Sequence, residues 1–227
     1  MDFLVAVSHY TKNLMSQLNL KNIEVIPNGF EIKSFEKKVF TPPQSPKLIT
    51  VGNVTQRKGQ QNVIRALSLL LEVFPKLEYH IVGIPTEQDE LEVLTRELKV
   101  EEAVFFHGRV SEERKIKLLL DSDIFVMLSE ETDKGDVEGF GIAVLEANHL
   151  GLPAIGSKNS GLEDAISDGF SGEIISAWHK EELLSAVQNI LKNYKAYSGQ
   201  AQRWSEDFKW EKIIEQYLDL SMHTNED

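Results

Sequence analysis

Residues 47–83 decide the fold class of this chain, and they read KLITVGNVTQRKGQQNVIRALSLLLEVFPKLEYHIVG. Two β-rich runs, 47–52 and 77–83, stand on either side of a segment with helical periodicity, 59–73. Strands that alternate with helical segments of this length are typical of β-α-β units, in which both strands lie parallel in one sheet. The stretch therefore predicts one unit of a parallel sheet.

The same alternation continues along most of the chain. Several strand-like runs are apolar throughout, as expected when helices cover both faces of a sheet. The sequence therefore predicts an α/β fold, a Rossmann-like parallel sheet with helices on both faces, which binds ligands at the carboxyl ends of its strands. We expect strands at 3–7, 23–26, 47–52, 77–83, 103–108, 124–128, 153–156 and 172–175, and helices at 9–19, 59–73, 87–98, 111–121, 141–150, 161–167, 179–193 and 200–221.

Three parts can be distinguished along the sequence. Prolines at positions 42, 43 and 46 indicate an extended linker before the strand at 47–52. We therefore expect residues 1–42 to be separate from the sheet that residues 43–200 form, and too short for a domain of their own. Residues 201–227 are expected to form a C-terminal helix and tail, which either pack back on the sheet or reach another domain.

Composition narrows the function and the location. The net charge of −12 argues against a general nucleic-acid-binding protein, which needs a basic face. Apolar runs stay well short of the roughly 18 residues that span a bilayer. The sequence contains no cysteine, which excludes disulfides and thiolate metal sites and fits a reducing compartment. We therefore expect a cytoplasmic protein.

The run EGFGIAVLEA, residues 138–147, indicates a ligand site. Gly139 and Gly141 lie where a polar turn meets an apolar helix. Unpaired N–H groups and the dipole at a helix N-terminus attract anions such as phosphate. Glu138 precedes the helix, and Glu146 lies within it, about 12 Å further along the axis. A phosphate site with a carboxylate on either side suits a nucleotide sugar, which has hydroxyl groups at both ends and charge in the middle.

Each carboxylate also has a simpler explanation. Glu138 is equally consistent with a solvent-facing residue before an ordinary helix. Glu146 is more informative because it interrupts an apolar helix, and a buried or half-buried carboxylate needs a partner. That partner is either a ligand hydroxyl group or a structural salt bridge, and both remain open from the sequence.

Two further loops follow strands and precede helices, so a parallel sheet places them at the same edge. In the first, residues 52–59, Arg57 and Lys58 can neutralise a diphosphate. The alternative is a solvent-exposed loop with an incidental pair of cations. In the second, residues 156–163, small residues such as Gly161 let the backbone approach a ligand, or simply form a turn with a helix cap.

Taken in order, these motifs resemble the retaining glycosyltransferases of the GT-B fold, specifically glycosyltransferase family 4, the group 1 transferases. The resemblance runs from VSHYTKNL and VIPNGF through VGNVTQRKG, VFFHGRV and DIFVMLS to the segment that begins EGFGIAVLEA. Its most specific element is the E-x7-E pair, Glu138 and Glu146. Such enzymes have two Rossmann-like domains, the first mainly for the acceptor and the second for the nucleotide-sugar donor. The chain resembles the C-terminal half of such a GT-B fold, which implies that the acceptor domain is missing from this sequence.

The resemblance implies roles for the residues of the EGFG run. Glu138 would bind hydroxyl groups of the donor sugar, and Glu146 those of the ribose. Phe140, Gly141 and Ile142 would offer backbone N–H groups to the diphosphate.

Outside that run, Lys58 would neutralise charge on the leaving nucleoside diphosphate in the transition state. Lys58 and Glu138 are therefore the expected catalytic residues, and Val110 falls where the family holds the base. No metal or other cofactor is expected, because cationic side chains and a helix N-terminus neutralise the phosphates. The expected donor-binding residues are Gly52, Asn53, Arg57, Lys58, Val110, Glu138, Gly139, Phe140, Gly141, Ile142, Glu146 and Gly161.

Two positions depart from the common family pattern. Asn53 stands where the family has arginine after the glycine of the first loop, and Arg57 beside Lys58 is a candidate to compensate. The paired glycines of the family's GG loop are represented by Ser160 and Gly161.

The leading hypothesis is the donor-binding half of a retaining hexosyltransferase that uses a UDP- or GDP-sugar. Its acceptor would be a sugar, lipid or glycan bound by the missing domain, through which the protein is either membrane-associated or free. The chain alone should transfer little sugar, because catalysis needs both reactants held together. The alternatives are a non-catalytic nucleotide-sugar-binding module that partners a separate acceptor domain, and a GT-B-like epimerase, which the E-x7-E spacing disfavours.

Overall fold

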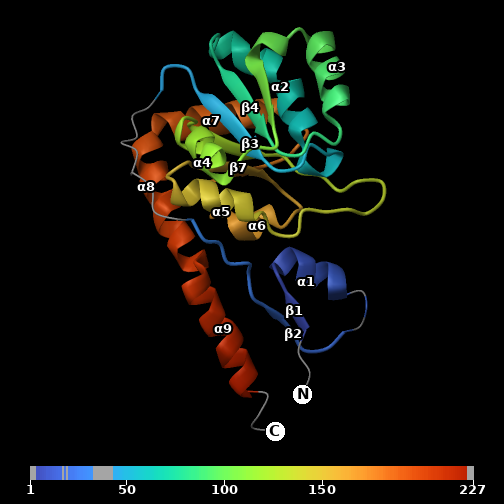
Figure 1. Ribbon diagram of the computed structural model, residues 1–227, viewed down its shortest axis with the longest axis vertical. Helices are drawn as coiled ribbons and strands as arrows, with labels where there is room; N and C mark the ends of the chain where they lie inside the picture. Colours follow the sequence, from blue (N-terminus) through green and yellow to red (C-terminus); the bar gives the residue numbers. More distant parts are fainter. Residues whose placement is uncertain (1–3, 17, 19, 33–42, 224–227) are drawn as a thin grey trace.

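The computed structural model describes residues 4–16, 18, 20–32 and 43–223, and its centre is a six-stranded sheet (Figure 1). All strand pairs are parallel, in the order β5-β4-β3-β6-β7-β8. The α/β class and the parallel sheet predicted from the sequence are confirmed. The strands are β3 (Lys47–Val51), β4 (Glu78–Val82), β5 (Val104–Gly108), β6 (Ile124–Met127), β7 (Ala154–Ser157) and β8 (Gly172–Ile175).

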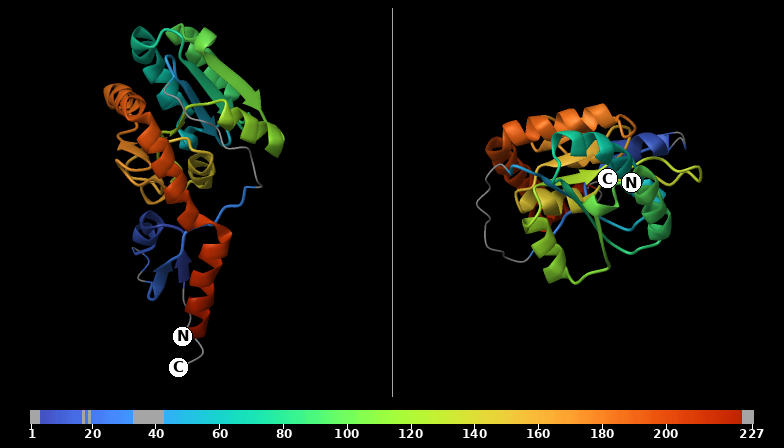
Figure 2. Two further views of the ribbon diagram at one scale, coloured as in Figure 1. Left: turned by 90° about the vertical axis from the view of Figure 1, so that its left-hand side faces the viewer. Right: turned by 90° about the horizontal axis from the view of Figure 1, so that it is seen from above.

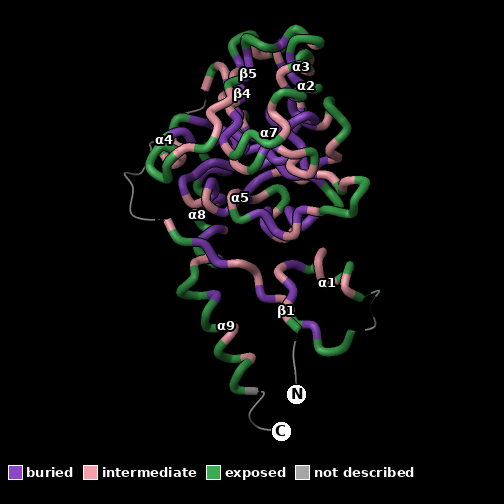
Figure 3. Tube along the Cα trace, turned by 45° about the vertical axis from the view of Figure 1, so that its right-hand side comes forward, coloured by how far each residue is buried: buried purple, intermediate pink, exposed green. Residues whose placement is uncertain are grey.

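Helices cover both faces of this sheet, and each face has its own hydrophobic core. One core joins the sheet to α2 (Gln60–Val73), α3 (Gln88–Leu98) and α7 (Lys180–Lys192). The other joins it to α4 (Glu112–Leu120), α5 (Ile142–His149) and α6 (Leu162–Ala165). All four residues of β6 are buried, which explains its uniformly apolar sequence. Figure 3 shows the buried residues concentrated in this part of the chain.

A smaller unit precedes the main sheet. Strands β1 (Leu4–Ala6) and β2 (Ile23–Val25) pair in parallel as a separate two-stranded sheet, with α1 (His9–Ser16) between them. The Asp164 carboxylate accepts hydrogen bonds from the backbone N–H groups of His9 and Tyr10, and so caps α1 from the main domain. The first two strands are therefore not part of the main sheet. Of the three prolines that indicate the linker, Pro42 lies outside the described residues, whereas Pro43 and Pro46 directly precede β3.

The prediction of a single helix at 200–221 is wrong, because this region contains parts of two long helices. They are α8 (Tyr194–Ser205) and α9 (Trp210–His223), so the expected boundary after residue 200 falls within α8. Between them, the Phe208 carbonyl oxygen accepts a hydrogen bond from the Phe30 N–H, and the Trp210 N–H donates to the Phe30 carbonyl oxygen. This strand-like pairing interrupts the helical ladder. Beyond it, α9 extends from the main domain toward the end of the molecule that holds β1 and β2 (Figures 1 and 2).

Helix α6 is also shorter than the predicted 161–167. It ends because Ile166 takes an extended conformation and buries its side chain in the core. Over the described residues, no helix has both the length and the apolar character required to cross a membrane.

Candidate functional site

Most of the predicted residues meet where the strand order of the sheet reverses. From β3 the chain passes through α2 to β4 on one side, whereas from β6 it passes through α5 to β7 on the other. The loops that follow β3 and β6 therefore diverge and leave a crevice at the carboxyl ends of the strands, the usual ligand position in such sheets. A cavity of about 500 Å³ lies there. Its lining comprises Val7, Asn28, Val51, Gly52, Asn53, Arg57, Lys58, Glu138, Gly139, Phe140, Gly141, Ile142 and Ala143.

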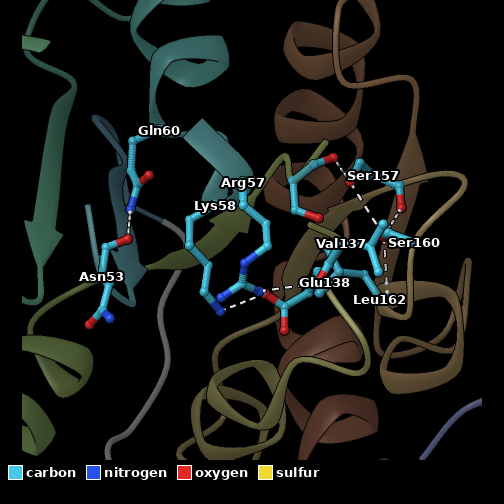
Figure 4. Close-up of polar contacts among 10 residues, drawn as sticks. Asn53, Arg57, Lys58, Gln60, Val137, Glu138, Ser157, Ser160 and Leu162 are labelled. Atoms are coloured by element: carbon cyan, nitrogen blue, oxygen red, sulfur yellow. Dashed lines mark hydrogen bonds and ion pairs between the residues drawn. The ribbon is translucent and has the colours of Figure 1, made fainter. Parts of the chain in front are cut away.

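Two cations of the β3–α2 loop converge on one carboxylate in this cavity. Lys58 Nζ lies 2.6 Å and Arg57 Nη1 lies 2.7 Å from Glu138 Oε2. The Glu138 side chain is 9% exposed, and that of Lys58 is 14% exposed. Figure 4 shows both cations reaching Glu138 from the same side. The sequence predicted these residues in one site but not their direct contact.

The loop that carries the cations is held by close packing. Residues Gln56–Lys58 form one 3-10 turn that ends at Gly59, whose φ is +73°. A Cβ atom on Gly59 would lie 1.7 Å from the Leu128 carbonyl oxygen, so only glycine fits between this loop and the end of β6. Asn53 is exposed, and its carbonyl oxygen accepts a hydrogen bond from the buried Gln60 amide. Asn53 and Arg57, which is the candidate to compensate for the absent arginine, both line the cavity.

Gly161 contacts the backbone of the Glu138 loop and does not line the cavity. Its N–H donates to the Glu138 carbonyl oxygen at 2.8 Å. A Cβ atom on Gly161 would lie 2.1 Å from the Gly139 carbonyl oxygen. Ser160, at the position of the family's other glycine, is buried and donates its hydroxyl to the Ser157 carbonyl oxygen at 2.8 Å. The GG-like loop therefore has a positioning function in this structure.

Helix α5 points its N-terminus at the cavity. It begins at Ile142 after Gly141, whose φ is +99°. The first N–H groups of a helix have no partners within it, so this end is suited to an anion. The Phe140 side chain is buried and lies against Phe208, with ring centroids 5.9 Å apart. Phe140 thus anchors the loop in the core and leaves its backbone at the cavity.

Glu146 has a partner that sequence reasoning missed. Lys115 Nζ lies 3.0 Å from Glu146 Oε1 and 2.9 Å from Oε2. Burial raises the pKa of the Glu146 carboxyl above its ordinary value, and the hydrogen bonds from Lys115 oppose that rise. The salt bridge, one of the two partners that the sequence left open, is formed with Lys115. Lys115 belongs to none of the motifs. The only signal in the sequence that could have identified it is its position five residues after Val110, in a predicted helix.

Val110 and Lys115 lie at a second, neighbouring cavity of about 350 Å³. Gly52 and Asn53 line both cavities, so the two adjoin at the loop after β3. Its full lining is Val51, Gly52, Asn53, Val82, Gly83, Ile84, Arg109, Val110, Glu112 and Lys115. Apolar side chains and strand-end backbone make most of this wall, which suits a flat, uncharged group.

A larger cavity of about 620 Å³ lies against Val54, Thr55 and Gln56 of the same β3–α2 loop but contains none of the predicted site residues, and it is a poor place for a phosphate. Its lining includes four glutamates, at positions 87, 90, 97 and 130, against the single cation Arg65. Among the described residues, no group of three histidine, aspartate or glutamate side chains is arranged to hold a metal ion.

The family model described as "Glycosyl transferases group 1" matches residues 31–208. The chain belongs to this family. The matched range contains the loops after β3, β5 and β6, which line the two cavities, and it contains Glu138 and Glu146. Outside the match lie β1, α1, β2 and the whole of α9. Membership agrees with the resemblance that the sequence motifs carried.

Curated relatives are similar over nearly the whole chain but are themselves longer. The chain is 27% identical over 229 residues to an uncharacterized glycosyltransferase of Methanocaldococcus jannaschii, covering 95% of the chain and 57% of that protein. It is 28% identical over 231 residues to the N-acetyl-alpha-D-glucosaminyl L-malate synthase of Bacillus anthracis, covering 95% and 58%. The chain thus spans somewhat over half the length of these relatives.

Solved structures share the fold. The Anabaena protein HepE, solved in complex with UDP and glucose, superposes with a TM-score of 0.79 at 21% identity. The superposition covers 97% of this chain and 63% of HepE. It supports the assignment of the GT-B glycosyltransferase fold. The six-stranded sheet of this chain corresponds to one of the two Rossmann-like halves of that fold.

Proposed function

We propose that this chain is the donor-binding half of a retaining glycosyltransferase, which transfers a hexose from a nucleoside-diphosphate sugar to an acceptor. The observation that carries the proposal is the convergence of Lys58, Arg57, Glu138 and the N-terminus of α5 on one cavity. Two cations and a row of backbone N–H groups match the charge of a diphosphate.

The two cavities divide the donor between them. The diphosphate occupies the 500 Å³ cavity, against Lys58, Arg57 and the first N–H groups of α5. The nucleoside occupies the adjoining 350 Å³ cavity beside Val110. Glu146, whose partner Lys115 lines that cavity, is the acceptor for the ribose hydroxyl groups. Glu138 then faces the sugar. A UDP or GDP donor fits this arrangement, and HepE was solved with UDP.

Glu138 changes partners when the donor binds. Without a donor, its Oε2 atom accepts hydrogen bonds from both Lys58 and Arg57. Phosphate oxygens compete for the same two cations, and their higher charge favours the exchange. The released carboxylate becomes an acceptor for sugar hydroxyl groups. Lys58 stays on the diphosphate and stabilises the charge that grows as the glycosidic bond to phosphate breaks.

These cations also replace a metal ion in the proposal. Lys58, Arg57 and the helix N-terminus together supply the positive charge that a divalent cation would otherwise bring. Donor binding is therefore expected to be the same with and without a chelator such as EDTA.

The acceptor is assigned to a second domain that packs against the N-terminal unit and α9. A parallel sheet of only two strands, such as β1–β2, normally needs more strands and helices around it. Along α9, apolar residues are exposed at every fourth position: Trp210, Ile214, Leu218 and Met222. Both features lie at the same end of the molecule (Figures 1 and 2). They fit a covering domain, which the greater length of the relatives also supports.

Titration calorimetry with UDP, GDP and ADP tests the donor-binding part. We expect at least one to bind with a dissociation constant of about 1 mM or tighter, and to raise the unfolding temperature because it binds only the folded state. Failure of all three to bind contradicts the proposal. The chain alone is expected to transfer little sugar. In the whole protein, NMR of the product should show the donor's anomeric configuration retained.

A further inference from the structure

Lys115 connects the two helices beside the nucleoside cavity. Its ammonium group lies 3.0 and 2.9 Å from the two carboxylate oxygens of Glu146, on α5. The same group lies 2.9 Å from Glu112 Oε1, one turn earlier on α4. The Lys115 and Glu146 side chains are 15% and 16% exposed. The pair is thus largely shielded from water.

The hydrogen-bonding capacity of Lys115 is fully used in this arrangement. An ammonium group has three N–H donors, and three carboxylate oxygens surround it. Each oxygen of Glu146 has further lone pairs, so this carboxylate can accept additional hydrogen bonds. A ligand hydroxyl group therefore finds its partner at Glu146, while Lys115 holds that partner in place.

The charged residues in the lining of the 350 Å³ cavity are Arg109, Glu112 and Lys115. The lining also includes apolar side chains from the ends of the strands, such as Val51 and Val82. A ligand that fills this cavity needs a flat apolar part and a polar, hydroxyl-bearing part. A nucleoside has both.

We propose that Lys115 is a positioning residue for the nucleoside half of the donor, and that it acts by holding the Glu146 carboxylate charged and oriented toward the ribose hydroxyl groups. This inference rests on the proposed donor-binding function. It adds a residue outside every recognised motif of the chain.

The charges around Glu146 predict how nucleoside binding depends on pH. Burial, and the nearby Glu112 carboxylate, raise the pKa of Glu146, and Lys115 opposes them. Burial alone would lower the pKa of Lys115, but its hydrogen bonds with Glu112 and Glu146 raise it, so it stays charged. One turn further along α5, His149 pairs with Glu206 at 3.4 Å.

Without Lys115, the Glu146 pKa should therefore rise further. A protonated carboxyl group is a weaker acceptor for ribose hydroxyl groups. Nucleoside binding should then weaken as the pH falls, beginning at a higher pH than in the unmodified protein.

Binding measurements on Lys115→Gln test this, with Lys117→Gln as the matched control. Lys117 lies on the same helix but is exposed, so both variants lose one positive charge from α4. For the nucleoside diphosphate that the unmodified protein binds, we expect Lys115→Gln to weaken binding about 10-fold near pH 8, and about 30-fold or more near pH 5.5. Lys117→Gln should stay within about 2-fold at both, as should pyrophosphate binding by either variant.

Several outcomes overturn the inference. Equal affinities of Lys115→Gln and Lys117→Gln, or equal losses for pyrophosphate and nucleoside diphosphate, contradict a role at the nucleoside. Lys115→Arg keeps the charge and should bind within about 3-fold of the unmodified protein, so a loss as large as that of Lys115→Gln is also contradictory. If the unmodified protein binds no nucleoside diphosphate, the proposed function itself fails, and the inference with it.

Discussion

Glu138 and Glu146 are both paired with lysine, but the two pairs are built differently. Glu138 lies in the loop before α5, and its cations lie in the loop after β3, so neither side of this pair is in an α-helix. Glu146 and Lys115 each lie within an α-helix that also contributes buried residues to the core, such as Leu145 on α5 and Leu119 on α4. A pair between loops can exchange partners at lower cost than a pair between packed helices. Under the proposed function, a donor opens the first pair and leaves the second pair closed.

The largest expected effect comes from Glu138→Ala. In the whole protein that carries this chain, we expect transfer to fall about 1,000-fold, because the sugar loses its carboxylate. The affinity for nucleoside diphosphate should stay the same or increase, since Lys58 and Arg57 are then free for phosphate. Steady-state kinetics and calorimetry measure the two quantities. A parallel loss of both would mean that the Glu138 pair does not open on binding.

Lys58→Met should have the next largest effect, about 100-fold on transfer. It should also weaken nucleoside diphosphate binding, because one of two phosphate partners is lost. Arg57→Met is the matched comparison, since Arg57 contacts the same carboxylate oxygen but is 31% exposed against 14% for Lys58. The Arg57 variant should lose less of both quantities. Identical kinetics of the two variants would contradict separate roles for the two cations.

Gly161→Ala tests the support beneath Glu138. The new methyl group would meet the Gly139 carbonyl oxygen, so we expect a loss of about 2 kcal/mol in the free energy of unfolding. Gly199→Ala is the control, because Gly199 lies within α8 with no atom within 4 Å of its would-be Cβ. That variant should gain about 0.5–1 kcal/mol from helix propensity. Denaturant unfolding of both measures the difference, and equal stability would show that the loop shifts freely.

The smallest expected effect is a pH dependence of stability at Glu146. Its pKa is raised in the folded protein, so its contribution to stability is fully present below the ordinary glutamate pKa of about 4.3. That contribution is lost as the pH rises through the raised folded pKa. The difference in unfolding free energy between the unmodified protein and Glu146→Gln should therefore decline over this window and then level off. If this difference in unfolding free energy rises with pH, the pKa of Glu146 is not raised in the folded protein.

Most of the fold was predictable because strand-helix alternation is a local property of the sequence. Five strands of the main sheet lie within the predicted ranges and β7 extends one residue beyond its range, since each strand is a short apolar run between turn residues. The break between α8 and α9 was not predictable. It depends on the pairing of Phe30 with residues 208–210, which are distant in sequence, whereas the local pattern continues as one helix.

The residues of the site were predictable from the sequence, but the contacts between them were not. The residues of the EGFG run and the RKG loop stand out because glycines and charges interrupt apolar runs. Lys115 does not, because a lysine in the first turns of a helix is ordinary on a protein surface. Only the packing of α4 against α5 brings it to Glu146 and makes it a buried partner.

The sequence by itself determined the class of fold, the family and the identity of the residues around the crevice, because each follows from local periodicity and short motifs. The tertiary structure decided which charges meet. Ion pairs such as Lys58–Glu138 and Lys115–Glu146 join segments 80 and 31 residues apart, and their formation depends on strand order and helix packing. Those pairings decide how the two glutamates of the E-x7-E motif differ.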